Sequence, residues 1–521
     1  MGEGSGGDRL GRRWAAAVVG LAALGLLPGL GGSTRLSYHE AIVAQGAREM
    51  IAAGAWLVPT LDGRPWLEKP PLLHWLVAVA ATIAGGVTEL AARLPSALAA
   101  AGLALAVATL AARRLGPAVG GLAGCVQATV AWSVVRGRLA ESDILLACLV
   151  AWTMVALDRL RLGDRDGGGP SRLARRFLIG LGATALAKGI GFGAALVLAA
   201  SATVLLWDRD RRTARCLLDP LGLAVGTIVG LAWPALILLR FPAALGLWTA
   251  HVADRLADRP EVFAGRASWW AYLPAVLGLT LPWTPLALMG ARRSLGRAVR
   301  DRGGLDRLLW AWAVAPMVLL SMASVKNAHY AIHALPPWSI WAALGLARLG
   351  ETLAGRGRSG PAIRRRLAVA FVGVAAAFGV GSWVVGSRFD RRGVEWAFYE
   401  AAARRVDPGE PVVLLYDDWD RLPYPSPFGP VPHDLAVRLY YLDRPALWRQ
   451  GVGAWPDLPA RPFVAIARAR DLDGLRRVGR VEAIAQGPPA RWDRTYAAYR
   501  VVPEASGAEA VAAVDPVRGR D

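Results

Sequence analysis

The chain has 521 residues, of which 54% are hydrophobic and only 19% charged, and its mean hydropathy is +0.35. A soluble domain carries more charge and less apolar bulk, so this composition excludes an ordinary soluble protein. The net charge of +20 would suggest nucleic-acid binding in a soluble chain, but the arginines gather in short segments between apolar blocks, as cytoplasmic loops of membrane proteins do. The three cysteines, Cys125, Cys148 and Cys216, fit neither a disulfide framework nor a CxxC pair.

Apolar blocks follow one another as far as Val385, and the longer ones have about 17 to 21 residues, enough to cross a bilayer as a helix. The first block, 14–30, follows three arginines and could be taken for a signal peptide. We interpret it as the first span because many similar blocks come after it. The later blocks are 72–84, 96–112, 118–135, 144–157, 177–187, 190–207, 221–239, 269–289, 309–322, 330–346 and 367–385.

The connections between blocks are of two kinds. Arginine-rich connections lie at 113–114, 159–176, 209–215, 292–307 and 348–366, whereas those at 33–71, 136–143, 240–268 and 324–329 hold aromatics, His and acids. The two kinds alternate across a membrane if the short block 72–84 is a re-entrant or interfacial helix. The positive-inside rule then places the basic connections inside and the others outside, so the loops at Glu40, Asp143, Lys188 and Tyr330 all fall outside. The sequence predicts roughly 11 to 13 transmembrane helices.

The composition becomes that of a soluble protein after Val385. Residues 394–404 predict an amphipathic helix, and 412–416 and 463–467 predict buried strands. A proline-rich loop at 422–432 and a frayed tail from about Ser506 complete this part. We therefore expect two domains, a transmembrane domain at 1–387 and a small extracytoplasmic α/β domain at 388–521.

The first outward connection places charged residues directly beside an apolar helix. After a helical stretch, Gly54 can cap the helix, Asp62-Gly63 is a turn signal, and Glu68-Lys69-Pro70-Pro71 forms a rigid charged turn. Acids and a lysine next to a membrane face are costly unless they bind something. This loop is therefore the first candidate for a functional site.

The loop resembles that of the bacterial glycosyltransferases related to the protein O-mannosyltransferases, which include the lipid A aminoarabinose transferase and belong to the GT-C superfamily. The family's loop reads Asp-Glu, a helix, Gly-Asp-Trp and Glu-Lys-Pro-Pro-Leu, where this chain has His39-Glu40, Gly54-Ala55-Trp56 and Glu68-Lys69-Pro70-Pro71-Leu72. Weaker similarity continues at 138–143, 187–189, 282–283 and 326–337. The resemblance implies a GT-C fold in the inner membrane. It also implies inverting transfer of a sugar from a polyprenyl-phosphate carrier to a lipid, glycan or protein acceptor at the outer face.

Such a reaction needs an acidic residue whose carboxylate orients or deprotonates the acceptor, and the resemblance implies Glu40 and Asp143 for this role. His39 stands where relatives carry the catalytic Asp, so either Glu40 takes over that role or His39 acts as the base. As structural alternatives, Glu40 would be a charge at a helix N-terminus and Asp143 a helix cap. Ile42 stands where aminoarabinose-type relatives often carry Arg, so lipid A is not assumed to be the acceptor.

The leaving lipid phosphate needs cations or hydrogen-bond donors beside it. The predicted substrate-binding residues are Glu68, Lys69, Lys188, Tyr330, Lys326 and His329. A lone lysine between apolar blocks is costly, and Gly189 beside Lys188 lets a lipid head group approach the backbone. The alternatives are a Glu68–Lys69 pair that braces the turn, a snorkelling Lys188 and an interfacial Tyr330.

Cofactors and rival functions stay open at this stage. A divalent metal is possible because His39, Glu40, Glu68 and Asp143 could converge, although their spacing does not require one. We interpret the DxD triplets at 164–166, 208–210 and 418–420 as chance, and the lack of a P-loop agrees with a lipid-borne donor. The alternative functions are a transporter or flippase of lipid-linked sugars, or a non-catalytic binder of them.

Overall fold

The structure, a computed structural model, describes residues 10–163, 169–256, 268–324, 326–416, 434–450, 455, 457–488 and 495–504. The predicted proline-rich loop, the predicted tail and the triplets at 164–166 and 418–420 lie outside these residues.

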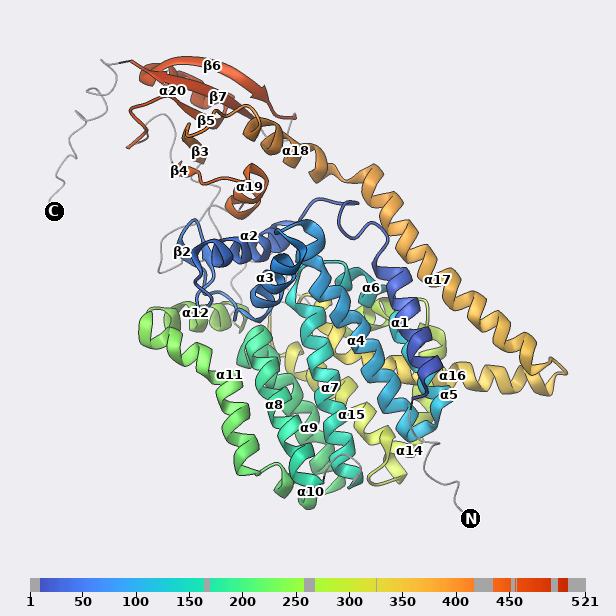
Figure 1. The fold of residues 1–521 in the computed structure, drawn as a ribbon. Helices are drawn as coiled ribbons and strands as arrows, with labels where there is room; N and C mark the ends of the chain where they lie inside the picture. The colour runs from blue at the N-terminus through green and yellow to red at the C-terminus, as the bar shows by residue number, and fades with distance from the viewer. Residues whose placement is uncertain are drawn as a thin grey trace.

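The described residues from 10 to 389 form a bundle of helices with one short hairpin (Figure 1). Its elements are α1 (Arg12–Leu26), α2 (Tyr38–Ala53), β1 (Thr60–Leu61), β2 (Arg64–Pro65), α3 (Leu72–Ala84), α4 (Glu89–Leu115), α5 (Pro117–Ala128), α6 (Ala131–Gly137), α7 (Ser142–Leu162), α8 (Pro170–Gly189), the π-helix η1 (Ile190–Ala194), α9 (Ala195–Asp208), α10 (Arg211–Cys216), α11 (Pro220–Arg240), α12 (Ala244–Leu256), α13 (Tyr272–Leu279), α14 (Thr284–Arg300), α15 (Leu305–Ser321), the 3-10 helix η2 (Ala328–Ala334), α16 (Leu335–Gly355) and α17 (Gly360–Phe389).

Two predicted blocks are not single straight helices, which corrects the sequence analysis. α5 and α6 meet at 58°, and α13 and α14 meet at 119°. At the first break, the hydroxyl of Thr129 donates to the carbonyls of Cys125 and Val126, and the chain leaves the helix there. The second break contains Pro282, which has no N–H to continue a helical ladder. A further difference is α12, which lies inside the predicted connection 240–268.

α8 and α9 form a hairpin that turns at Lys188 and Gly189. Lys188 leaves helical geometry (φ −148°, ψ 20°), and Gly189 has a positive φ of 82° that glycine adopts at little cost. After the turn, a Cβ on Gly193 would lie 2.0 Å from the carbonyl oxygen of Thr184, so only glycine allows this return. The ends of α8 and α9 that lie away from the turn are also close together. Leu173, near the start of α8, packs with Leu217, which follows α9 and α10 in the chain. The turn brings Lys188 to one end of the bundle.

Four of the five basic connections, all except 348–366, come together at one end of the bundle, which we call the basic end. Asp208 accepts from Arg161 and, at 2.9 Å, from Arg307, while Arg114 donates to the carbonyl of Gly303 at 3.1 Å. α10 lies at this end in Figure 1, and α2 and α3 lie at the opposite end. The alternation of loop types predicted from sequence therefore separates the two ends of the fold.

Four stretches are long and apolar enough to span a membrane among the described residues, or up to six if each bent pair counts as one span. The first count takes the α8–α9 hairpin as one stretch. α3 has 13 residues and is roughly 20 Å long, short of the roughly 30 Å bilayer core, as expected for an interfacial or re-entrant helix. The total of 11 to 13 spans stays a prediction.

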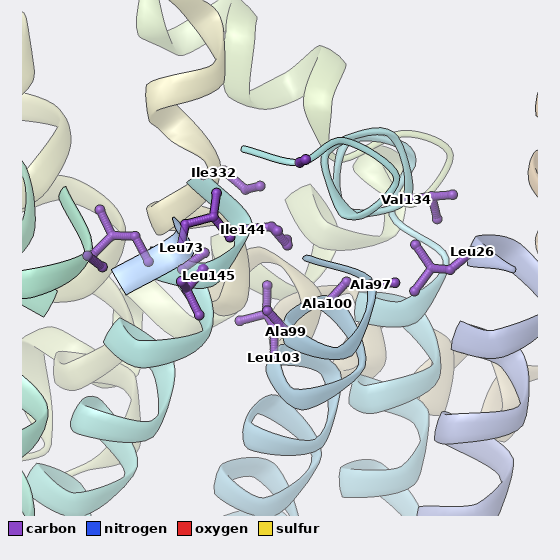
Figure 2. Packing of buried hydrophobic residues seen from close by; sticks show 14 of the residues in the cluster. Leu26, Leu73, Ala97, Ala99, Ala100, Leu103, Val134, Ile144, Leu145 and Ile332 are labelled. Carbon is purple, nitrogen blue, oxygen red and sulfur yellow. The ribbon is translucent and has the colours of Figure 1, made fainter. Parts of the chain in front are cut away.

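Small side chains let the helices approach closely beneath the α2 end. Figure 2 shows alanines of α4, among them Ala97 and Ala100, packed near Val134 of α6 and Ile144 of α7. On α11, glycines at every fourth position face α8; a Cβ on Gly226 would lie 2.5 Å from the carbonyl oxygen of Leu178. Such small-residue interfaces are typical of helices packed in membranes.

The chain ends in a small α/β unit, which α17 joins to the bundle (Figure 1). Its elements are α18 (Arg391–Ala403), β3 (Val412–Tyr416), α19 (Leu435–Leu442), β4 (Leu447–Gln450), β5 (Phe463–Arg468), η4 (Ala469–Asp471), α20 (Leu472–Val478), β6 (Gly479–Gln486) and β7 (Tyr496–Pro503). The strand order is β4-β3-β5-β7-β6, with β3 parallel to β4 and β5 and the other pairs antiparallel. The predicted helix and both predicted strands are present.

Candidate active site

A groove of about 510 Å³ opens between α8, η1, α11 and α12 at the α2 end. Its walls are mainly apolar and include Ile190, Phe192, Trp233, Pro234, Leu238 and Trp248. Its charged lining residues are Glu68, Lys69 and Lys188, all of them predicted from sequence. The groove therefore combines an apolar channel with two cations and one acid.

Lys188 forms an ion pair with Asp143, the first-turn acid of α7. The second oxygen of Asp143 accepts from Arg136 at 2.7 Å, and Arg136 also pairs with Glu141. The side chains of Lys188, Asp143 and Arg136 are at most a tenth exposed. The structure therefore brings Asp143 and Lys188, which the sequence predicts on the same side of the membrane, into direct contact, and the Glu141 side chain beside them is only 16% exposed.

Aromatic rings surround the Lys188 ammonium group. Its Nζ lies 4.8 Å from the ring centre of Tyr330 and 5.4 Å from that of Phe192, within range of cation–π attraction. Tyr330 in turn packs on Phe192 and His329, with ring centres 4.7 and 4.4 Å away. Burial lowers the pKa of His329 to about 4; Asp143 acts in the opposite direction, and the charges of Lys188 and Arg136 lower it further. His329 is thus neutral at physiological pH.

The first loop brings Glu68 and Lys69 to the groove. Glu68 is mostly buried and Lys69 is 40% exposed, with 3.9 Å between their charged atoms, so the predicted local pair is present but loose. Upstream, Asp62 and Gly63 form the predicted turn, both with positive φ, and Gly54 ends α2 in the left-handed conformation as predicted.

Glu40 lies in a different setting from Asp143. It is 1% exposed, and one carboxylate oxygen accepts from Arg93 Nε at 2.7 Å and from the Ala140 N–H at 3.1 Å. The other oxygen accepts from the Ser37 N–H at 2.8 Å, which completes a capping box at the start of α2. This is the predicted structural alternative, a helix N-terminal charge, reinforced by a buried arginine. The catalytic role of Glu40 stays a prediction, and this geometry does not favour it.

The other predicted residues lie around this cluster. His39 is exposed, stacks near Tyr38 with 5.0 Å between ring centres, and is close enough to contribute to the lowered pKa of His329. The Lys326 ammonium donates to the carbonyl of Ala323 at 2.6 Å. In the part of the chain that the structure describes, no three His, Cys, Asp or Glu side chains are grouped as a metal site requires.

The site residues predicted from the sequence do not include Arg93, Arg136 or the tryptophans of the groove wall. Arg136 had a detectable signal, since it lies in an outward connection where the positive-inside rule predicts few arginines. Arg93 sits near the start of an apolar block, and its partner Glu40 is 53 positions away. Nothing local in the sequence marks that pairing.

Residues 68–237 match the family model described as dolichyl-phosphate-mannose-protein mannosyltransferase. The undecaprenyl phosphate-α-4-amino-4-deoxy-L-arabinose arabinosyl transferase of Edwardsiella ictaluri (strain 93-146) is 30% identical over 333 residues, which cover 62% of this chain and 57% of that protein. A second such transferase, from Pseudomonas fluorescens (strain Pf0-1), is 28% identical and covers 66% of this chain and 60% of its own length. The chain therefore spans less than two thirds of these curated relatives.

Among solved structures, ArnT from Cupriavidus metallidurans bound to undecaprenyl phosphate aligns with a TM-score of 0.72 at 18% identity, covering 93% of this chain and 98% of that one. The apo oligosaccharyltransferase of Archaeoglobus fulgidus aligns with a TM-score of 0.56 at 14% identity, covering 84% and 64%. At such identities the shared property is the fold. These matches confirm the predicted resemblance and the predicted fold class, a helical membrane protein of GT-C type followed by a small α/β unit.

Proposed function

We propose, from the GT-C membrane fold of this chain and its resemblance to the lipid-linked-sugar transferases, that it is an inverting glycosyltransferase of the inner membrane. It moves a sugar from a polyprenyl-phosphate carrier to a lipid, glycan or protein acceptor. The observation that carries the proposal is the placement of Lys188, which lines an apolar groove, pairs with Asp143 and lies against Tyr330.

The donor suits the groove in both of its parts. A polyprenyl tail is apolar and fits walls built from residues such as Trp233 and Leu238. Its phosphate carries the negative charge that Lys69 and Lys188 attract, and these cations stabilise the phosphate as it departs. Gly189 exposes backbone beside Lys188, so a phosphate can approach closely.

The transfer step requires one bond to form and one to break. The acceptor oxygen attacks the anomeric carbon, the bond from that carbon to the phosphate oxygen breaks, and the lipid phosphate leaves with the electron pair. A hydroxyl acceptor gives its proton to a carboxylate, for which Asp143 is our candidate. When the donor phosphate draws Lys188 toward it, Asp143 keeps Arg136 but loses one cation, and its carboxylate becomes more basic.

The α2 end faces outward in this proposal, and the C-terminal α/β unit lies outside the membrane with it. The support is the arginine-rich basic end, where Arg114, Arg161 and Arg307 meet, because such loops stay in the cytoplasm. A cysteine-free variant tests this with single cysteines at Asp473 and Arg209. A membrane-impermeant maleimide should label Asp473→Cys in intact cells and leave Arg209→Cys unlabelled; the reverse pattern contradicts the orientation.

The activity test uses purified protein in nanodiscs, a radiolabelled polyprenyl-phosphate sugar and a mixture of envelope acceptors. Wild type should transfer label, and Lys188→Gln should lower transfer at least roughly 100-fold, the size of effect seen when one oxyanion-stabilising group is removed. Arg240→Gln is the matched control, a cation at the end of α11 outside the lining of the groove. Absence of transfer by wild type, or full activity of Lys188→Gln, would sink the proposal. Movement of the lipid across vesicles without transfer would favour a flippase.

A further inference from the structure

Residues 56–69, the loop that ends in Glu68 and Lys69, are held by tryptophans of the helix bundle and of the C-terminal unit. Among the described residues, three indole N–H groups of the bundle donate to its backbone carbonyls: Trp75 to Trp56 at 2.6 Å, Trp233 to Leu57 at 2.8 Å and Trp248 to Leu67 at 2.7 Å. A fourth indole, Trp448 on β4 of the C-terminal unit, donates to the Asp62 carboxylate at 2.9 Å. The loop is therefore tied to both parts.

The contact of Trp448 falls on the turn of the β1–β2 hairpin. The guanidinium of Arg64 lies over the Trp448 ring, 4.6 Å from its centre. From below, the carboxylate of Glu49 on α2 accepts from the backbone N–H groups of Asp62 and Gly63 at 2.9 and 3.1 Å. The turn is clamped between an acid of the bundle and an aromatic ring of the C-terminal unit. Residues 66–69 leave this turn and reach the groove.

Further contacts fix the C-terminal unit over the same loop. The Leu36 N–H donates to the hydroxyl of Tyr441 at 2.7 Å, and Arg48 donates to the carbonyl of Tyr440 at 2.9 Å. The hydroxyl of Tyr440 donates to the carbonyl of Val87 at 3.0 Å. These bonds join α19 to the segment just before α2, to the C-terminal half of α2 and to the segment just before α4, so β4 and its tryptophan have a defined place above the hairpin.

We propose that the C-terminal unit is a positioning element for the donor site, with Trp448 as its positioning residue. Trp448 acts through Asp62 and Arg64 on the hairpin, and the hairpin sets where Glu68 and Lys69 stand at the groove. The proposal rests on the proposed function for its consequence, since Lys69 matters there as a ligand of the donor phosphate. The positioning of the loop by β4 does not depend on the proposed function, because it is inferred from the contacts of Trp448 with Asp62 and Arg64.

The test measures the loop and the ligand separately, on the full chain in nanodiscs. Hydrogen–deuterium exchange of residues 60–69 reports the hairpin, and native mass spectrometry with undecaprenyl phosphate reports binding. Trp448→Phe keeps a ring for Arg64 but removes the N–H donor. It should speed exchange of residues 60–69 up to roughly tenfold, the equivalent of one net hydrogen bond. The dissociation constant for undecaprenyl phosphate should rise by about three- to tenfold for the same reason.

Matched variants separate positioning from general damage. For Asp62→Asn, the exchange rate of residues 60–69 and the dissociation constant should both stay within about twofold of wild type. The amide oxygen of Asn still accepts the indole N–H, and Asn tolerates the left-handed backbone found there. Trp269→Phe, at a tryptophan that is 77% exposed, should change neither reading. Unchanged exchange in Trp448→Phe, or faster exchange without weaker binding, overturns the proposal. If wild type binds no undecaprenyl phosphate, the proposed function fails, and exchange alone decides whether the unit positions the loop.

Discussion

Two buried carboxylates, Glu40 and Asp143, lie at the same end of the bundle, and each pairs with a cation, but only one pair borders the groove. Glu40 and Arg93 are 1% and 2% exposed and enclosed by backbone groups. The Asp143 pair has Lys188, which lines the groove and touches Tyr330. Burial and ion pairing are therefore common to a structural and a candidate catalytic acid. Access to an open groove is what separates them.

The largest expected effect is on transfer by Asp143→Asn. This variant keeps the shape of the side chain but removes the charge and the proton acceptor, so transfer should fall about 10²- to 10⁴-fold. The assay is transfer of radiolabelled sugar at matched amounts of folded protein. Asp306→Asn is the control, because Asp306 pairs with Arg297 at 2.6 Å at the basic end. Equal activity of Asp143→Asn and wild type would show that Asp143, like Glu40, has a structural role only.

Glu40→Gln should act on stability instead. It leaves Arg93 buried without a counter-charge, which typically costs about 3–5 kcal/mol of folding free energy. Denaturant or thermal unfolding in detergent measures this, and the activity of the remaining folded protein should be near that of wild type. A replacement of both residues by leucine should recover part of the loss. Recovery is incomplete because Arg93 also donates to the carbonyls of Leu30 and Thr34. A stable but inactive Glu40→Gln would restore Glu40 as the candidate catalytic base.

Tyr330 offers a finer probe of the pair at the groove. Tyr330→Leu removes the ring beside Lys188, and a cation–π contact of about 0.5–2 kcal/mol corresponds to roughly a 2- to 30-fold loss of donor binding. Tyr330→Phe keeps the ring and loses only the hydroxyl that accepts from Asn327. Its dissociation constant for the donor lipid should therefore stay within about threefold of wild type. Titration with undecaprenyl phosphate distinguishes the two. An equal loss in both variants would assign the contribution to the hydroxyl.

The smallest expected effect concerns His329. Its pKa is lowered from 6.5 to about 4 in the folded chain, so between these values the unfolded chain binds a proton that the folded chain does not. Stability should therefore fall as the pH drops from 7 to 5. His329→Gln should show a smaller drop in melting temperature over this range than wild type. An identical drop in both proteins would show that other groups control the acid response.

Local patterns were enough for many elements of this protein. The helix α3, the strand β3, the cap at Gly54 and the turn at Asp62 lie where the sequence predicts them, since each depends on neighbouring residues alone. The bends between α5 and α6 and between α13 and α14 were missed. Apolar composition continues across both breaks, and hydropathy does not record the loss of a backbone hydrogen bond.

The amino-acid sequence alone predicts a membrane protein with basic and non-basic loops on opposite sides, and it predicts that Asp143 and Lys188 share one side. Those conclusions follow from composition and order along the chain. Which cation pairs with which acid became visible only in the folded chain. Glu40 meets Arg93 and Asp143 meets Lys188 because four separate helices pack as they do. A buried charge is stable only with its partner in place, and that partner is chosen by packing between segments distant in sequence.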